Sequence, residues 1–251
     1  MQIGGLQKTT LIDYPGKVAC TVFLVGCNFR CPWCYSSELV LPEKMKKQPR
    51  ISEKEFFEFL KERRGLLEAV TICGGEPTLN KNLSEFIKKI KKLGFLVKLD
   101  TNGSNPEMLK GLIKNKLIDY VAMDIKAPIG TKMQNAKYKP QNDNSKLKNK
   151  YEQVTGIKIN LEKIKKSIDI IKNSGGDYEF RTTVVPTIHT KEDILQIVRD
   201  ISPAKKYYLQ NFRSEKTLDS KFEKIKSYSD KMLLEIKKEI EGFFEICEVR
   251  T

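Results

Sequence analysis

Short apolar runs rich in β-branched residues alternate along the chain with longer segments in which apolar residues recur every three to four positions. This alternation is typical of repeated β-α units around a parallel sheet, whose strands are apolar on both faces. The 251 residues are enough to fill one core. We therefore predict an α/β fold, an open, partial parallel barrel of the (β/α)6 type, with strands over 18–25, 69–73, 95–99, 120–125, 178–185 and 207–210.

Two of the segments between these runs carry clear helix signals. One helix is expected over 53–63, because Ser52 can cap its first turn and Glu55 follows three residues later. Another is expected over 83–93, where Gly94 is a natural residue to end the helix.

The whole chain, 1–251, is expected to form one domain with an insertion around 130–153, after the fourth predicted strand. The insertion is rich in lysine and asparagine. Such a segment is either a mobile loop that docks a partner or solvated surface. Its lysines are Lys132, Lys137, Lys139, Lys146, Lys148 and Lys150.

Residues suited to ligand binding follow five consecutive predicted strands. In parallel sheets, ligands bind outside the carboxyl ends of the strands, so these residues are expected to share one mouth. In chain order they are Gly26 with Cys27, the run 74–77, the run 100–103, Asp124 with Lys126, and the run 186–189.

Three of the six cysteines crowd into one short loop, at Cys27, Cys31 and Cys34, while Cys20, Cys73 and Cys247 are scattered in apolar or strand-like runs. Structural zinc takes four ligands, and Cys73 would have to supply the fourth. Iron–sulfur clusters also usually take four thiolates. Three cysteines on one loop therefore suggest a four-iron cluster with one iron left open for a substrate, with structural zinc as an alternative.

The spacing Cys-x-x-x-Cys-x-x-Cys, with an aromatic residue before the last cysteine, resembles the signature of the radical S-adenosylmethionine (SAM) superfamily. The runs Gly-Gly-Glu-Pro at 74–77, Asp-Thr-Asn-Gly at 100–103 and Met-Asp-Ile-Lys at 123–126 extend the resemblance over most of the chain. It implies a [4Fe–4S] cluster on the three cysteines whose open iron is chelated by SAM. The reduced cluster then cleaves SAM to methionine and a 5′-deoxyadenosyl radical, which abstracts hydrogen from a substrate.

The same resemblance suggests which residues contact SAM. Gly74 and Gly75 would let the backbone approach its amino-acid end, Glu76 would accept a hydrogen bond from its ammonium group, and Lys126 would pair with its carboxylate. The full predicted set is Trp33, Cys34, Tyr35, Gly74, Gly75, Glu76, Asn102, Asp124, Ile125, Lys126 and His189.

Several of these assignments have a structural alternative. Asp100 and Asp124 would either pair with Lys98 and Lys126 or share a monovalent cation, as in the related pyruvate formate-lyase activating enzyme. Trp33 and Tyr35 would lie against the adenine of SAM or be core aromatics. His189 would lie near the ribose or adenine or be a hydrogen-bonded bystander.

The segment 4–17, with its Leu-Ile-Asp-Tyr-Pro-Gly-Lys run, resembles one subgroup, the activating enzymes of glycyl radical enzymes, and particularly those of anaerobic ribonucleoside-triphosphate reductase. The run 180–184 agrees with this resemblance. Members remove a Cα hydrogen from one glycine of a partner enzyme. Tyr35 and Ser36 replace the His-Asn pair common in the subgroup. Because the sequence has no second ferredoxin-like cysteine cluster, an external low-potential electron donor such as flavodoxin or ferredoxin is expected.

The net charge of +14, from 46 basic and 32 acidic residues, would suit a polyanionic partner, and it is equally typical of solvated lysine-rich helices. We do not expect nucleic acid or a membrane as a partner. The sequence shows no charged leader before an apolar run, so a reducing cytoplasm is expected. Two other functions remain open: radical SAM modification of RNA or a small nucleoside-like substrate, and a non-catalytic metal-binding module.

Overall fold

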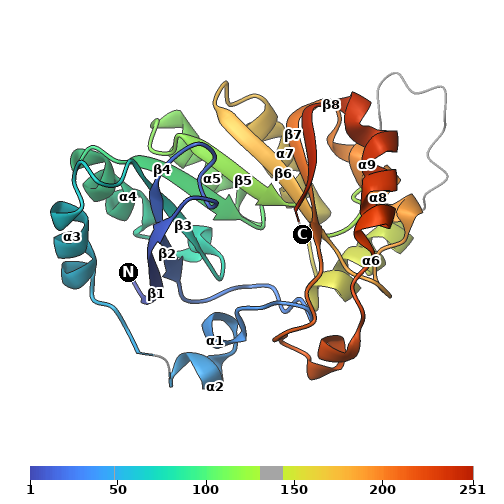
Figure 1. Cartoon of the computed structure of the whole chain (residues 1–251), viewed down its shortest axis with the longest axis horizontal. Coiled ribbons are helices and arrows are strands. Elements are labelled where there is room, and N and C mark those ends of the chain that lie inside the picture. Colours follow the sequence, from blue (N-terminus) through green and yellow to red (C-terminus); the bar gives the residue numbers. More distant parts are fainter. Residues whose placement is uncertain (48, 131–143, 251) are drawn as a thin grey trace. The chain divides into compact units, whose positions relative to one another are not determined.

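The computed structural model describes residues 1–47, 49–130 and 144–250, and its elements are shown in Figure 1. The chain divides into two compact units. Unit 1 consists of Met1–Asn28, Ser36–Ala122 and Ser174–Asp177, and unit 2 consists of Phe29–Tyr35, Met123–Asn173 and Tyr178–Thr251.

Unit 1 contains four strands that follow one another in chain order, namely β1 (Ile3–Thr10), β2 (Ala19–Leu24), β3 (Ala69–Gly74) and β4 (Leu96–Thr101). The strand β1 is antiparallel to β2, while β2, β3 and β4 are parallel. The sequence pattern does not predict β1, because it contains two glycines and the exposed stretch 7–9.

The helices of unit 1 are α1 (Ser37–Val40), α2 (Pro42–Met45), α3 (Glu53–Glu62), the 3-10 helix η1 (Pro77–Leu79), α4 (Leu83–Lys92) and α5 (Pro106–Lys114). The predicted capping box of α3 is present, since the Ser52 side chain accepts from the Glu55 N–H and the Glu55 carboxylate accepts from the Ser52 N–H. In Figure 1, α3 and α4 lie beside the strands of unit 1, and α4 contacts β4.

Unit 2 contains most of β6 (Asp177–Val184), with β7 (Ala204–Asn211) and β8 (Phe244–Arg250) parallel beside it. The strand β5 (Tyr120–Asp124) gives its last two residues to unit 2. Helix α9 packs on β7 and β8, and it also contacts α8. The helices are α6 (Asn144–Thr155), α7 (Leu161–Lys172), α8 (Lys191–Ile201), η2 (Ser220–Lys224), α9 (Asp230–Ile240) and η3 (Glu241–Phe243).

The segment that the sequence presents as an insertion is partly a packed helix. Its second half forms α6, in which Leu147, Tyr151 and Val154 are buried. These residues are spaced by four and three positions, which places them on one helical face. Residues 145–153 are therefore neither a mobile loop nor mere surface. The lysines at 132, 137 and 139 lie outside the described residues.

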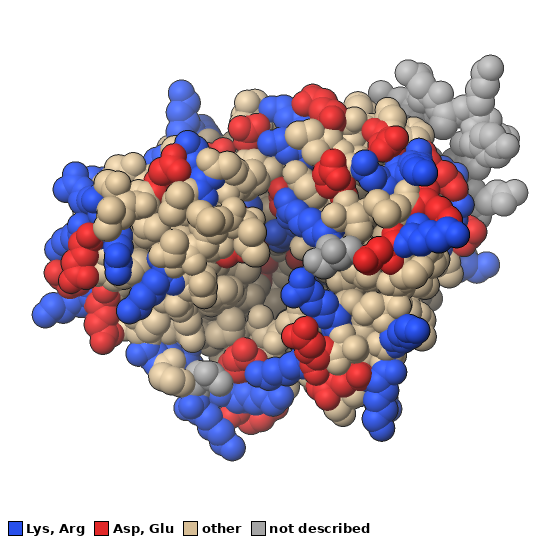
Figure 2. Space-filling model, viewed as in Figure 1, with Lys and Arg blue, Asp and Glu red and all other residues tan. Residues whose placement is uncertain are grey.

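Charged side chains cover the helix surfaces of both units. Lys88 pairs with Glu85, and Lys61 pairs with Glu58, each three residues apart on an exposed helical face. Figure 2 shows basic side chains spread over the face in view with acidic ones among them. This distribution favours solvated helix faces as the origin of the lysine content. Of the helices in the described ranges, none is long and apolar enough to cross a membrane.

Candidate active site

The predicted site residues are divided between the two units. Unit 1 holds Cys27, Gly74, Gly75, Glu76, Asp100 and Asn102, and unit 2 holds Cys31, Trp33, Cys34, Tyr35, Asp124, Ile125, Lys126 and His189. Three residues of chain, 28–30, separate Cys27 from Cys31.

In unit 1, two glycines allow the ends of β2 and β3 to approach each other. The Gly75 N–H donates to the Leu24 carbonyl (2.9 Å), and the Glu76 N–H donates to the Gly26 carbonyl (2.8 Å). A Cβ at Gly75 would lie 2.0 Å from the Gly26 oxygen, and one at Gly74 would lie 2.3 Å from the Leu24 oxygen. Only glycine fits at either position, and the close approach fixes the backbone directly before Cys27.

The Glu76 carboxylate connects the two loops that follow β3 and β4. Its Oε1 accepts from the Thr78 N–H (3.1 Å), the Thr78 hydroxyl (2.5 Å) and the Thr101 hydroxyl (2.8 Å), and its Oε2 accepts from the Asn102 N–H (2.6 Å). Burial raises the pKa of Glu76 despite these donors. The geometry gives Glu76 a loop-positioning role, and its contact with SAM stays a prediction.

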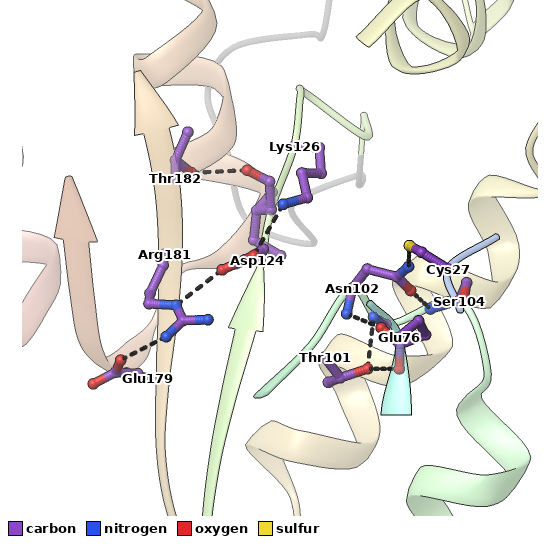
Figure 3. A network of polar contacts seen from close by, with 12 residues as sticks. Cys27, Glu76, Thr101, Asn102, Ser104, Asp124, Lys126, Glu179, Arg181 and Thr182 are labelled. Atoms are coloured by element: carbon purple, nitrogen blue, oxygen red, sulfur yellow. Dashed lines mark hydrogen bonds and ion pairs between the residues drawn. The ribbon is translucent and has the colours of Figure 1, made fainter. Parts of the chain in front are cut away.

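Asn102 contacts the first cysteine of the loop. Its amide nitrogen lies 3.9 Å from the Cys27 sulfur and donates to Asn28 Oδ1 (3.0 Å), while its Oδ1 accepts from the Ser104 N–H (2.9 Å). Figure 3 shows the Asn102 side chain beside Cys27, with Ser104 close by. Hydrogen bonds to ligand sulfurs are one of the means by which proteins tune iron–sulfur clusters.

Both aspartates of the predicted cation site have lysine partners within their own units. The Lys98 ammonium lies 2.5 Å from Asp100, and its side chain is only 2% exposed. The Lys126 ammonium lies 2.9 Å from Asp124. The structure thus shows the ion-pair alternative, and a shared monovalent cation stays a prediction.

In unit 2, the loop carrying Cys31 and Cys34 turns tightly, with the Cys34 N–H donating to the Cys31 carbonyl (3.0 Å). Trp33 is buried and meets the His189 ring edge-on, with centroids 6.0 Å apart. Tyr35 stacks on Phe212, and its hydroxyl accepts from the Arg213 N–H (2.7 Å). Trp33 is therefore a core aromatic, as its structural alternative predicts, whereas Tyr35 is 39% exposed and is not part of the core. Contacts of Trp33 and Tyr35 with SAM stay predictions.

Asp124 lies in a row of alternating charges that we call the charge ladder: Lys126, Asp124, Arg181, Glu179 and Arg250. Arg181 Nε lies 2.9 Å from Asp124, Arg181 Nη1 lies 3.8 Å from Glu179, and Arg250 binds both oxygens of Glu179 at 3.0 and 3.1 Å. Figure 3 shows the row from Glu179 to Lys126.

The ladder fixes the charge states of its members at the strand end. Burial disfavours the Asp124 carboxylate, but Arg181 and Lys126 outweigh it and hold the pKa of Asp124 below its usual range. Burial likewise opposes the charge on Lys126, yet the negative charge of Asp124, followed by those of Cys31 and Cys34 in their thiolate form, raises the pKa of Lys126. Lys126 is thus a permanent cation close to two of the three cysteines.

The sequence pattern alone did not identify Glu179, Arg181 or Arg250 as site residues. The available signal was a pair of opposite charges two positions apart, Glu179 and Arg181, on either side of Phe180 within a predicted strand. Two such residues share one face of a strand, and charges are rarely buried without partners.

His189 holds the backbone on which Lys126 is mounted. Its Nδ1 accepts from the Val185 N–H (3.0 Å), so the Nε2 that faces the Lys126 carbonyl (2.9 Å) carries the proton. Ile125 is fixed similarly, since its N–H donates to the Arg181 carbonyl (2.8 Å) and its carbonyl accepts from Thr182 (3.0 Å). Contacts of His189 and Ile125 with SAM stay predictions.

Acid should destabilise the fold through His189. Burial lowers the pKa of His189 to about 4, from 6.5. The unfolded chain therefore takes up this proton first, so the stability associated with the neutral ring is complete above pH 6.5 and is lost as the pH falls toward 4, by about 3 kcal/mol. Urea unfolding between pH 7.5 and 4.5 measures this loss of unfolding free energy. A His189→Gln variant should show a flatter pH dependence, and equal slopes would contradict the assignment.

The residues present fit an iron–sulfur cluster. Burial raises the pKa of Cys20 to about 12 and that of Cys247 to about 11, so both are poor thiolates, whereas Cys27 has an amide donor and Cys31 and Cys34 have a nearby cation. Among the described residues, no three His, Cys, Asp or Glu side chains gather as one metal ion would require. A four-iron cluster differs in this respect, because each thiolate binds its own iron.

Comparisons with known proteins identify the family of the chain. Residues 21–201 match the model of the Radical SAM superfamily. A relative from Methanocaldococcus jannaschii, provisionally named a glycyl-radical enzyme activating enzyme, is 34% identical over 99% of this chain and 95% of its own. A 7-carboxy-7-deazaguanine synthase from Thermococcus kodakarensis is 28% identical over 44% of this chain and 50% of its own.

The fold has a solved counterpart in Streptococcus suis SuiB bound to S-adenosylmethionine, with a TM-score of 0.63 and 14% identity. The match covers 91% of this chain, which spans about half (51%) of SuiB. The α/β fold with parallel strands predicted from the sequence is confirmed. Together with the family match over residues 21–201, these similarities show that the chain belongs to the radical SAM superfamily.

Proposed function

We propose that this chain activates a glycyl radical enzyme by removing a Cα hydrogen from one glycine of that partner. We further propose that Cys27, Cys31 and Cys34 hold the [4Fe–4S] cluster, that 1–251 acts as one radical SAM domain, and that the partner is anaerobic ribonucleoside-triphosphate reductase.

Cys27, Cys31 and Cys34 would hold the cluster, which would supply the one-electron reduction of SAM to methionine and a 5′-deoxyadenosyl radical able to take the glycine hydrogen. The electron would come from an external low-potential donor of the flavodoxin or ferredoxin class. The residues of the chain would bind SAM and hold the cluster ligands and the surrounding loops in position. Lys126 would pair with the SAM carboxylate, the Asn102 amide would donate to the Cys27 sulfur, and Glu76 would keep the loops after β3 and β4 together.

The observation that carries the proposal is the extent of one similarity. The Methanocaldococcus jannaschii relative, with its provisional name, matches 99% of this chain, whereas the 7-carboxy-7-deazaguanine synthase matches 44%. The segment 4–17, which carries the resemblance to the activating subgroup, lies outside the family match at 21–201. The resemblance of this segment to the activating subgroup therefore supports the proposal independently of the family match.

The direct test is electron paramagnetic resonance on a mixture of reduced, SAM-loaded protein with candidate partners, beginning with anaerobic ribonucleoside-triphosphate reductase. We expect a glycyl doublet that requires SAM and reductant, and that is absent when Cys31→Ala replaces the wild type. Absence of the doublet with every candidate would contradict the proposal.

A second candidate is a radical SAM enzyme that modifies RNA or a small nucleoside-like molecule. The similarity to the 7-carboxy-7-deazaguanine synthase favours the small-molecule form of this function. Turnover on such a substrate without a glycyl doublet would identify it. The third function, a non-catalytic metal module, would instead predict metal binding without release of 5′-deoxyadenosine.

Removal of the Lys126 ammonium should weaken SAM binding without releasing iron. A charge-assisted hydrogen bond contributes about 1.5 to 3 kcal/mol, so Lys126→Ala should raise the dissociation constant of SAM by about 10- to 100-fold. Calorimetry and iron per chain measure the two properties. Lys172→Ala is a matched control, since this half-buried lysine donates to the Ile201 and Ser202 carbonyls instead. Parallel loss of iron in Lys126→Ala would contradict its assigned role.

A further inference from the structure

Helix α6 contacts the loop that carries Cys31 and Cys34. The Arg30 N–H, one residue before Cys31, donates to the Thr155 carbonyl at 2.7 Å. Thr155 is the last residue of α6 and is fully buried. The carboxyl end of the helix therefore supplies a backbone acceptor to the start of the cysteine turn, where carbonyls have no partner within the helix.

Gly156 makes this contact possible. Its φ is +67°, and a Cβ at this position would lie 2.7 Å from the Arg30 carbonyl oxygen and 3.0 Å from the Arg30 Cβ. The neighbouring oxygen belongs to the backbone and cannot rotate away. Any side chain at 156 would therefore push the cysteine loop away from α6.

The same helix also contacts Lys126. The Tyr151 ring is fully buried, and its hydroxyl accepts from the Lys126 N–H at 3.4 Å. The Lys126 carbonyl is held on the other side by His189 Nε2 at 2.9 Å. Thr155 Oγ1 donates to the Tyr151 carbonyl (2.8 Å), so the two contact points on α6 are themselves joined.

Helix α6 is anchored independently of these contacts. Leu147 and Val154 are buried, and Lys150 pairs with Asp193 in the capping box of α8. The helix is thus held by buried apolar side chains and by an ion pair, in addition to its contacts with Arg30 and Lys126. Helix α6 can therefore hold Arg30 and Lys126 at a fixed position relative to each other.

We propose that Tyr151, Thr155 and Gly156 form a brace that sets the position of the Cys31–Cys34 turn relative to Lys126. The brace rests on the proposal that these cysteines hold the cluster. Its three members are positioning residues, because they act through Arg30 and Lys126. Their function is to place the cluster and the amino-acid end of SAM in one fixed relation.

The first test compares Gly156→Ala with Gly175→Ala in the anaerobically reconstituted protein. Both glycines have left-handed backbones, with φ of +67° and +71°, but a Cβ at Gly175 meets no atom within 4 Å. The two variants therefore share the backbone strain and differ in the contact with Arg30. We expect Gly156→Ala to retain less iron per chain and to show an altered resonance spectrum of the reduced cluster, while Gly175→Ala resembles the wild type.

The second test, Tyr151→Phe, keeps the ring and removes the acceptor of the Lys126 N–H. We expect unchanged iron, a KM for SAM raised about fivefold, as for the loss of one hydrogen bond, and a smaller change in kcat. We also expect Tyr151→Phe to weaken the change that SAM induces in the electron paramagnetic resonance spectrum of the reduced cluster. This variant tests the brace even if Gly156→Ala does not fold by circular dichroism.

Cys31→Ala separates the brace from the cluster assignment. If Cys31→Ala keeps its iron, the assignment of the cluster to this loop is wrong. If Cys31→Ala loses iron while Gly156→Ala and Tyr151→Phe match the wild type in iron, KM and resonance spectrum, the brace is overturned.

Discussion

Replacing Cys31 with alanine is expected to reduce the release of 5′-deoxyadenosine from SAM by about a thousandfold or more, to the background level. The cluster would have only two thiolates of the loop left, and four-iron clusters depend on thiolate ligation for their assembly. Anaerobic reconstitution followed by chromatography and iron determination should show a matching loss of iron. Product release under reducing conditions is the second measurement.

Cys247→Ala is the matched control for this experiment. Cys247 is buried in β8, and burial raises its pKa to about 11, so it stays a protonated thiol. The same substitution at this position should leave iron content and product release at the wild-type level. Wild-type product release by Cys31→Ala, or iron loss equal in both variants, would contradict the role of the loop.

Replacing Glu179 with alanine is expected to lower the free energy of unfolding by about 3 kcal/mol. Glu179 is only 1% exposed and carries the negative charge that stands between Arg181 and Arg250 in the charge ladder. Removal of one partner leaves a buried charge uncompensated, which costs about 3 to 5 kcal/mol. The lower figure applies here, because the Arg250 side chain is partly exposed. Urea unfolding at pH 7 measures the change.

Two further variants test this prediction: Glu179→Gln at the same position, and Glu85→Ala as a control in an exposed ion pair. The glutamine keeps the size and an acceptor oxygen, so its loss of stability should be intermediate. Glu85 pairs with Lys88 on an exposed face of α4, where an ion pair contributes little. If Glu179→Ala unfolded at the same urea concentration as Glu85→Ala, the ladder would have no role in stability.

Apolar periodicity was sufficient to locate the strands β2 to β7, but it did not predict β1. The predicted strand at 69–73 corresponds to β3 at Ala69–Gly74, and the one at 120–125 corresponds to β5 at Tyr120–Asp124. These runs are buried, so sequence and packing follow the same pattern. Helix α6 was missed because lysine and asparagine dominate its exposed face, and only three apolar residues mark the buried one.

The site could be predicted where its chemistry depends on residue type, and not where it depends on tertiary contacts. The roles of the three cysteines and of the glycines at 74 and 75 could be predicted, because they depend on a thiol group and on the absence of a side chain, both of which the sequence gives directly. The hydrogen bonds of the Glu76 carboxylate could not be predicted from the sequence. Two of its donors, Thr101 and Asn102, come from the end of β4 and the loop after it, and only the folded chain brings them to the carboxylate.

The partial burial of the charge ladder distinguishes it from the surface lysines in its response to salt. Mobile ions screen exposed charges beyond about 8 Å at physiological salt, but they screen partly buried pairs much less. Molar salt should therefore release a partner held by the surface lysines that make up the +14 net charge, while the pairing of Lys126 with Asp124 survives. A chain washed in concentrated salt would be freed of polyanions and still keep the electrostatics of its site.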